Sequence, residues 1–244
     1  ETGGGSPYNN TNPKAKDALP RIRQLIFEGK NKEAQELCGP TICSPSANGM
    51  PYQTVGSLHL DFDGISNYND YYRDLDIAKA IATTRFTANG VTYTREAYTS
   101  FPDQVLVIRL TASQKKSISF TAKYTTPYKS NVVRSISSRK ELQLNGKAND
   151  HEGIEGKVEF TALTRIENSG GSLEATSDST LQVKNANSVT LYVSIGTNFV
   201  NYKDVSGNAL STAQKYLKQV NKNYSKSKAA HINTYPVSYT HLRA

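Results

Sequence analysis

The sequence of 244 residues contains no tryptophan, only one methionine and two cysteines, and it lacks any long apolar run. A helix that crosses a membrane needs about 18 consecutive apolar residues, so the sequence predicts no membrane span. The Gly-x-Ser-x-Gly, Walker, His-Glu-x-x-His and dinucleotide-binding motifs are also missing. These absences remove support for nucleophilic hydrolases, nucleotide-binding proteins and zinc hydrolases.

The two cysteines, Cys38 and Cys43, have no histidine or second cysteine pair near them in the sequence. Zinc sites need such further ligands, so we expect no metal and no cofactor. The spacing is compatible with a local disulfide in an oxidising compartment and equally with two free thiols. The cysteines therefore do not identify the compartment.

The formal charge of +8 would suit an acidic partner, but the basic residues are spread over the whole chain. We therefore expect no nucleic-acid partner. The apolar fraction of 36% and the charged fraction of 20% are typical of a folded domain. The densest basic stretch has helix-like spacing and is predicted to be a solvated face: Lys215, Lys218, Lys222, Lys226 and Lys228.

The first part of the chain has helical periodicity. Apolar residues recur every three to four positions from Ala18 through Ile22 to Ile26, which predicts one helix. A second helix is predicted over Lys32 to Leu37, because Gly39-Pro40 is a typical stop signal.

From Gly49 onward the apolar period changes to two. Leu58, Leu60 and Phe62 alternate with polar residues, as one half-buried strand face would. The Asn89-Gly90 pair between two strand-like runs predicts a tight hairpin. Regularly spaced strands without helices between them indicate an antiparallel β-sandwich and exclude a βαβ sheet. The further predicted strands are 104–111, 117–124, 141–144, 156–168, 180–184 and 188–197.

After Asp204 the pattern becomes helical again, with Ala209, Ala213 and Leu217 on one face. Pro236 is expected to break this last helical region. The residues from Pro236 to Ala244 continue no periodicity and are predicted to be a non-native tail.

Two places have side chains suited to chemistry. Asp150, His151, Glu152 and Glu155 crowd a Gly-flanked loop between strands, where a histidine between carboxylates could transfer protons. The alternative is a solvated, charged loop.

Tyr52 and Gln53 offer an aromatic platform and an amide for sugar recognition, or they pack and satisfy loop backbone. Arg73, Asp74 and Asp76 lack further oxygen ligands in register, so a surface strand with a local ion pair is expected instead of a calcium site.

Several collinear strings resemble the N-terminal domain of glycoside hydrolase family 95. They cover about residues 5 to 235 in the same order as in that family. The strings are Ser6-Pro7-Tyr8-Asn9-Asn10, Leu25-Ile26-Phe27-Glu28-Gly29-Lys30, Pro51-Tyr52-Gln53-Thr54-Val55-Gly56-Ser57-Leu58, Tyr72-Arg73-Asp74-Leu75-Asp76, Tyr93-Thr94-Arg95-Glu96, Phe101-Pro102-Asp103-Gln104-Val105-Leu106-Val107, Asn149-Asp150-His151-Glu152-Gly153-Ile154 and Gly196-Thr197-Asn198-Phe199.

This resemblance implies a mainly β fold, an antiparallel supersandwich with short N-terminal helices and a C-terminal linker helix. Residues 1–205 would form that domain without its first strands. Residues 206–235 would begin a helical linker to an absent (α/α)6 catalytic barrel, and residues 236–244 would be the tail.

The resemblance also implies a bacterial, periplasmic or secreted α-L-fucosidase that cleaves terminal fucose from oligosaccharides or polysaccharides with inversion. No catalytic residue is then expected in this chain, which would be inactive alone. His151, Glu152, Tyr52 and Gln53 would face the barrel or its substrate. The alternative is a non-catalytic carbohydrate-binding β-sandwich, which the absence of tryptophan disfavours.

Overall fold

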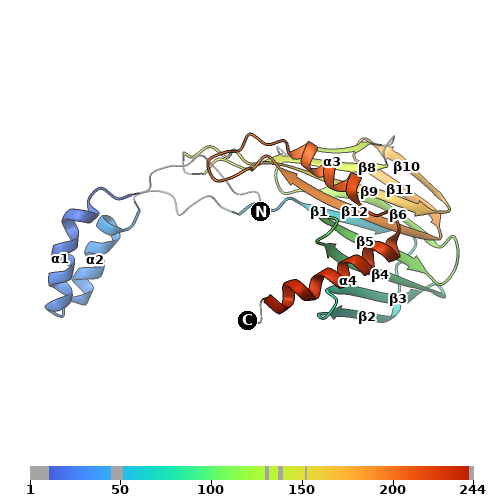
Figure 1. Ribbon diagram of the computed structural model, residues 1–244, viewed down its shortest axis with the longest axis horizontal. Helices are drawn as coiled ribbons and strands as arrows, with labels where there is room; N and C mark the ends of the chain where they lie inside the picture. Colours follow the sequence, from blue (N-terminus) through green and yellow to red (C-terminus); the bar gives the residue numbers. More distant parts are fainter. Residues whose placement is uncertain (1–10, 45–51, 130–131, 137–139, 152, 242–244) are drawn as a thin grey trace.

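The computed structural model describes residues 11–44, 52–129, 132–136, 140–151 and 153–241, and it is a β-sandwich with four helices in these ranges (Figure 1). All strand pairs are antiparallel, so the expected fold class is confirmed. The strands are β1 (Ser57–Phe62), β2 (Asn69–Asp76), β3 (Ile81–Ala88), β4 (Val91–Ser100), β5 (Val105–Ala112), β6 (Ile118–Thr125), β7 (Val132–Ile136), β8 (Glu141–Lys147), β9 (Glu159–Ser169), β10 (Ser172–Ser177), β11 (Thr180–Ala186) and β12 (Ser188–Thr197).

The strands form two sheets of unequal width. The small sheet has the order β1-β6-β11-β10, and the large sheet has the order β2-β3-β4-β5-β12-β9-β8-β7. The predicted hairpin joins β3 to β4, with Asn89 at φ 51° and Gly90 at φ 73°, as a type I′ turn requires. β2 is the expected surface strand, and the ion pair of Asp76 is with Lys79 at 2.7 Å.

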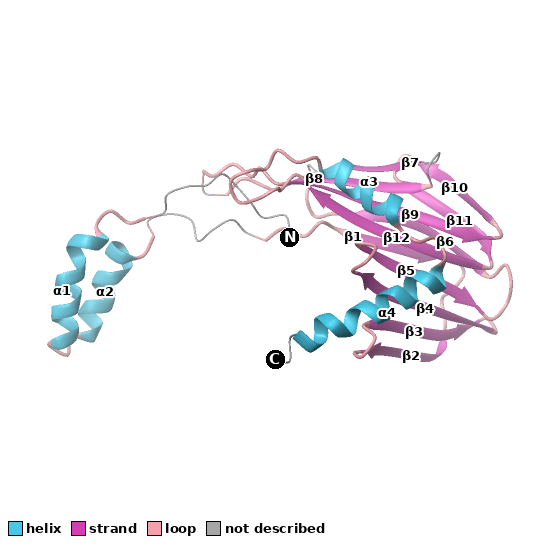
Figure 2. Cartoon of the chain, viewed as in Figure 1, coloured by secondary structure: helices cyan, strands magenta, loops and turns pink. Residues whose placement is uncertain are grey.

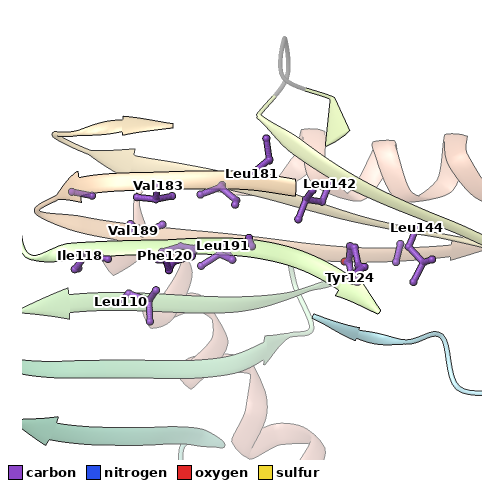
Figure 3. Close-up of a cluster of buried hydrophobic side chains, with 14 of the residues drawn as sticks. Leu110, Ile118, Phe120, Tyr124, Leu142, Leu144, Leu181, Val183, Val189 and Leu191 are labelled. Carbon is purple, nitrogen blue, oxygen red and sulfur yellow. The ribbon is translucent and has the colours of Figure 1, made fainter. Parts of the chain in front are cut away.

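The main core lies between the two sheets (Figure 3). β6 alternates buried and half-buried residues, so that Ile118, Phe120 and Tyr124 face the large sheet. Leu142 and Leu191 meet them from β8 and β12. Each such buried side chain stabilises the fold by about 1.5–3 kcal/mol.

Helix α3 (Ala209–Gln219) covers the outer face of the large sheet and contacts β9 and β12. Ala213 and Leu217 point into a second core together with Tyr192. The helix lies so close to β12 that a Cβ on Gly196 would be 2.3 Å from the carbonyl oxygen of Ala209. Arg165 fixes the end of the helix, because its Nη1 donates to the carbonyl oxygen of Leu217 at 3.1 Å.

Helix α4 (Tyr224–His241) lies against β4 (Figure 1). Tyr224 and Ile232 pack on the second core, and polar side chains make further contacts. Tyr224 and Lys228 donate to the two carboxylate oxygens of Glu96 at 2.7 and 2.6 Å. Ser227 donates to Asp103 Oδ2 at 2.6 Å and accepts from the hydroxyl of Tyr98 at 3.2 Å. Residues at positions i, i+3 and i+4 thus form one polar contact face.

Two sequence predictions for the C-terminal region are wrong. Pro236 does not break the helix, since α4 continues through it to His241. A proline keeps a helical φ and removes a single N–H donor, and the contacts of Tyr224 to Lys228 hold the helix upstream of it. Lys228 is not on a solvated face, because it pairs with Glu96 and both side chains are about a quarter exposed (27%).

Helices α1 (Ala15–Phe27) and α2 (Asn31–Ile42) form a hairpin that stands apart from the sandwich (Figure 1). Its small core contains Ile22, Leu25 and Ala34. The predicted end of the second helix at Gly39-Pro40 is wrong, since α2 continues to Ile42. The reason is Asn12, whose Nδ2 donates to the carbonyls of Pro40 and Cys43 at 3.1 and 2.9 Å and satisfies the last turn.

Cys38 and Cys43, left open by the sequence, are both free thiols. Among the described residues, no helix combines the length and the apolar character needed to cross a membrane.

Candidate functional site

The candidate site is a group of loops at one end of the sandwich (Figure 2). It consists of residues 52–56 before β1, residues 148–158 between β8 and β9, and residues 198–208 between β12 and α3. We call these three segments the loop cluster. Hydrogen bonds between distant residues hold it together.

The first link joins the segment before β1 to the β8–β9 loop. The backbone N–H of Asn149 donates to Oε1 of Gln53 at 2.9 Å, across 96 residues of sequence. Gln53 is buried, with 7% of its surface exposed. Two regions that the sequence suggested separately are therefore in direct contact.

The β8–β9 loop folds back on itself. The carboxylate of Asp150 accepts the N–H of Gly156 at 2.9 Å, and His151 and Ile154 exchange two backbone hydrogen bonds at 3.0 and 2.9 Å. Position 156 has no room for a side chain, because a Cβ would lie 2.1 Å from the carbonyl oxygen of Ala148. These bonds tie the described residues of the loop to one another.

Asn198 links that loop to the segment after β12. Its Oδ1 accepts the N–H of Glu159 at 2.8 Å, and its Nδ2 donates to the carbonyl of Lys157 at 3.0 Å. Its own carbonyl accepts the N–H of Gly207 at 2.9 Å. One buried side chain therefore organises two of the three segments.

Large side chains project from this ordered backbone into solvent. Tyr52 is 77% exposed and Tyr202 is 74% exposed, while Phe199 and Val200 are each more than half exposed. The ammonium of Lys203 lies 5.2 Å from the ring centre of Tyr202. Exposed aromatic residues on a rigid loop frame are typical of a surface that meets a partner or a ligand.

The structure separates the four predicted site residues by role. Gln53 is a buried structural residue, whereas Tyr52 beside it points outward. His151 is half-buried in the β8–β9 loop, and Glu152 lies outside the described residues. The sequence reasoning missed Asn149 and Asn198 as organising residues, although both lie in strings that carried the family resemblance.

Five cavities lined by described residues contain no pair of facing carboxylates. Asp61 lines one of these five and Glu159 lines another, and the other three have no acidic residue in their lining. In the same ranges, no three residues of the histidine, cysteine, aspartate or glutamate types are grouped so that they could hold a metal ion.

A second polar group lies where α4 meets β4, and it includes Ser100, Asp103, Ser227 and His231. Both serine hydroxyls donate to Asp103 Oδ2, and Nε2 of His231 donates to the carbonyl of Lys79 at 2.8 Å. A nucleophilic triad needs the imidazole to accept the serine proton. Because each serine hydroxyl donates its single proton to Asp103 and not to the imidazole, we interpret these residues as an attachment of the helix.

Comparison with known proteins matches this chain to a glycosyl hydrolase domain and to proteins named as fucosidases. The family model described as "Glycosyl hydrolase family 65, N-terminal domain" matches residues 2–202. "Alpha-L-fucosidase 2" from Arabidopsis thaliana is 28% identical over 268 aligned residues, which cover 95% of this chain and 30% of that protein.

Two fungal relatives share a name. "Probable alpha-fucosidase A" from Aspergillus niger is 32% identical over 43% of this chain and 13% of its own length. The protein of that name from Aspergillus oryzae is 24% identical over 78% of this chain and 25% of its own length. The chain therefore spans less than a third of each of these relatives.

Proposed function

Since this chain belongs to the glycosyl hydrolase family 65 N-terminal domain family, we propose that it is the N-terminal β-sandwich of a longer exo-α-L-fucosidase. That enzyme would remove terminal fucose from oligosaccharides or polysaccharides with inversion, as glycoside hydrolase family 95 does. The observation that supports this most strongly is the similarity to an α-L-fucosidase along 95% of the chain.

The chemistry is assigned to a part of the longer protein outside residues 1–244. Inverting glycosidases need an acid and a base about 6.5–9.5 Å apart on opposite sides of the sugar. In line with this assignment, none of five cavities lined by described residues has two carboxylates in its lining. Residues 206–235 then begin the helical linker to the catalytic barrel.

The role proposed for the loop cluster is contact with that barrel at the rim of the sugar site. Tyr52, Phe199 and Tyr202 would supply the contact surface, and His151 would lie beside it. The hydrogen bonds of Gln53 and Asn198 keep this surface in a fixed shape. A preformed surface loses less conformational entropy when it binds.

A second candidate is a carbohydrate-binding module without catalysis. The exposed rings of Tyr52 and Tyr202 favour it, because aromatic rings pack against sugar faces. In this case the chain alone would bind fucosylated glycans, whereas the enzyme proposal requires the barrel. We further propose a bacterial source and a periplasmic or secreted location, as the resemblance to glycoside hydrolase family 95 implies.

The test compares the 244-residue chain with the longer protein on a chromogenic α-L-fucoside. We expect turnover by the longer protein and none by the chain. NMR of the first-formed sugar should show the β anomer, as inversion demands. Turnover by the purified chain would contradict the location of the chemistry, and saturable binding of the chain to a fucosylated glycan array would favour the second candidate.

Variants of the longer protein test the loop cluster. Tyr52→Ala should raise KM or reduce the amount of folded enzyme, because it removes a ring at the proposed contact. The matched control is Tyr72→Ala, which removes a half-exposed ring from β2 at the edge of the large sheet. Equal kinetics of both variants would exclude a role for Tyr52.

A further inference from the structure

A cavity of about 310 Å³ lies on the outer face of the large sheet, where α3 begins (Figure 1). Two neighbouring cross-strand pairs of β8 and β9 line it, with Asn145 opposite Thr161 and Lys147 opposite Glu159. Alternate residues of a strand share a face, so these four side chains lie on the same side of the sheet. Ala209, the first residue of α3, closes the cavity on one side. We call this cavity the β8–β9 pocket.

Asn145 presents hydrogen-bond donors in a fixed orientation. Its Oδ1 accepts from Nε2 of Gln143 at 3.0 Å and from Oγ1 of Thr161 at 2.9 Å. Thr161 is buried, with 4% of its surface exposed, so the oxygen side of the amide is turned toward the protein. An amide nitrogen has two N–H donors, and no described residue accepts a hydrogen bond from Nδ2 of Asn145. These two donors are available to a ligand.

Glu159 supplies the complementary acceptor. Its carboxylate has no ion-pair partner among the described residues, because Lys147 pairs instead with Glu155 at 3.0 Å. Its backbone is fixed by Asn198, since the N–H of Glu159 donates to Oδ1 at 2.8 Å and its C=O accepts the N–H of Asn198 at 3.1 Å. Glu159 is the diagonal neighbour of Asn145 on the sheet, and such residues lie about 7–8 Å apart. One bound group can therefore bridge the two side chains.

The charges of the pocket indicate the class of ligand. Among its described lining residues, Lys147 is the only basic one and Glu159 the only acidic one. An anion would meet the carboxylate of Glu159, and a metal ion would meet the ammonium of Lys147. A neutral molecule with hydroxyl groups avoids both repulsions, because a hydroxyl can donate to a carboxylate and accept from an N–H at the same time.

The size and the walls of the pocket suit a single sugar ring. Ligand pockets have volumes of about 300–1,000 Å³, so the β8–β9 pocket is at the small end of this range. The methyl group of Ala209 and the methylene stem of Lys147 offer apolar surface to the C–H groups of a ring. Hydroxyl groups and C–H groups alternate around a sugar, which matches this mixture of polar and apolar walls.

Exposed aromatic residues belong to the loop beside the pocket. The segment 198–208 leaves the sheet at Asn198, which is bonded to Glu159, and it ends where α3 begins at Ala209. Phe199 and Tyr202 on this segment are 53% and 74% exposed. Because aromatic rings pack against sugar faces, a glycan of several residues can extend from the pocket onto this loop.

We propose that the β8–β9 pocket binds one residue of a neutral glycan, with a sugar hydroxyl that accepts from Nδ2 of Asn145 and a hydroxyl that donates to the carboxylate of Glu159. The pocket binds the sugar without cleaving it, because hydrolysis with inversion needs two such groups and Glu159 is the only carboxylate in the described lining. The choice of fucose as the first sugar to test rests on the proposed function, whereas the chemistry of the pocket suits neutral sugars in general.

Titration of the 244-residue chain with L-fucose and with D-galactose, followed by proton–nitrogen NMR, tests the proposal. We expect saturable shifts of the amides of residues 145–147 and 159–161, with a Kd on the order of 1–10 mM for a small ligand with few contacts. Binding this weak would not hold the chain on a glycan array. Sodium sulfate should produce no such shifts. The absence of saturation with both sugars, or tighter binding of sulfate, would overturn the proposal.

Two variants locate the binding. Asn145→Asp keeps an acceptor for Gln143 and Thr161 but replaces the Nδ2 donors, so the Kd should rise about tenfold while the fold is retained. Glu159→Gln replaces a charged acceptor by a neutral one and should also raise the Kd, by about threefold to tenfold. The spectra of both variants show directly whether the chain is still folded.

The matched control is Glu167→Gln, which removes a carboxylate from the same face of β9 at a position that does not line the pocket. It should leave the Kd unchanged. Equal Kd values for Asn145→Asp, Glu159→Gln and this control would refute the site, and the hydrolysis test of the longer protein would stand as before. An inactive longer protein would refute the proposed function and leave the titration unaffected.

Discussion

Oε1 of Gln53 accepts the backbone N–H of Asn149 at 2.9 Å, and this bond ties the entry of β1 to the β8–β9 loop. Gln53 is buried while its neighbour Tyr52 is 77% exposed. Adjacent residues thus divide two tasks, since one fixes the loop and the other faces outward. Substitutions at these two positions should have different consequences.

Gln53→Ala should lower the free energy of unfolding by about 0.5–1.5 kcal/mol, because it removes the hydrogen bond between the segment before β1 and the β8–β9 loop. Tyr52→Ala, the matched control, should change it by less than about 0.5 kcal/mol. Urea denaturation of the 244-residue chain measures both. A small effect of Gln53→Ala would mean that water replaces the lost acceptor.

Breaking the ion pair of Arg165 and Glu141 should lower the free energy of unfolding more than breaking any other ion pair of the described strands. Nε and Nη2 of Arg165 donate to Glu141 Oε1 at 3.0 and 2.7 Å, and the glutamate is 1% exposed. Arg165→Met should cost about 3–5 kcal/mol because it leaves a buried carboxylate uncompensated. Thermal and urea unfolding measure the loss.

Two further variants make that prediction specific. The double variant Glu141→Leu with Arg165→Met should recover most of the loss, since no buried charge remains. Lys147→Met breaks the exposed pair with Glu155 and should cost less than about 1 kcal/mol. If Arg165→Met alone were as mild as Lys147→Met, the buried pair would not contribute as proposed.

The attachment of α4 should weaken in acid. Burial alone would raise the pKa of Glu96, but hydrogen bonds from Lys228 and Tyr224 outweigh it and hold this pKa below its ordinary value of 4.5. A lowered folded-state pKa contributes stability above the unfolded value, and this is lost as the pH falls through the folded one. Exchange of α4 amides should therefore accelerate below about pH 4.5.

The same helix should loosen in alkali. Burial raises the pKa of Tyr98 to about 12 from 10.0, so its contribution is complete below pH 10.0 and is lost as the pH rises through about 12. Glu96→Gln should remove the acid dependence and leave the alkaline one. An unchanged acid response in that variant would place the titrating group elsewhere.

The α1–α2 hairpin should be the least protected helical region of the chain. Its core includes only three buried residues, Ile22, Leu25 and Ala34, while Phe27 is 88% exposed. Short helices with little packing open readily. Hydrogen exchange should be faster in residues 15–42 than in β9 and β12, and equal protection would show that the hairpin is covered in solution.

Local patterns made much of the sandwich predictable. The Asn89-Gly90 turn depends on two adjacent residues, and the alternation of Leu58, Leu60 and Phe62 depends on one strand. Both are visible within ten residues of sequence. The order of the strands within each sheet could not be obtained in this way, because it depends on pairings between distant segments.

The candidate site and α4 were harder to predict for the same reason. The sequence indicates Gln53 as a candidate residue, but it does not reveal the contact with Asn149, because 96 residues separate the two. The α4 interface combines polar contacts with a few apolar ones, from Tyr224 and Ile232, so it leaves only a weak apolar period in the sequence, and Pro236 is a misleading stop signal. Asn198 acts through backbone groups of Lys157 and Glu159, which no motif of side chains reveals.

The hydroxyl of Tyr98 donates to Ser227, which is synthesised 129 residues later in the chain. Ribosomes add about 5–20 residues per second, so during synthesis β4 is complete roughly 6 to 26 seconds before its partner on α4 exists. For that interval Tyr98 and Glu96 on the outer side of β4, and Asp103 in the turn after it, are without their helix. The sandwich of a nascent chain should therefore be less stable until α4 has left the exit tunnel.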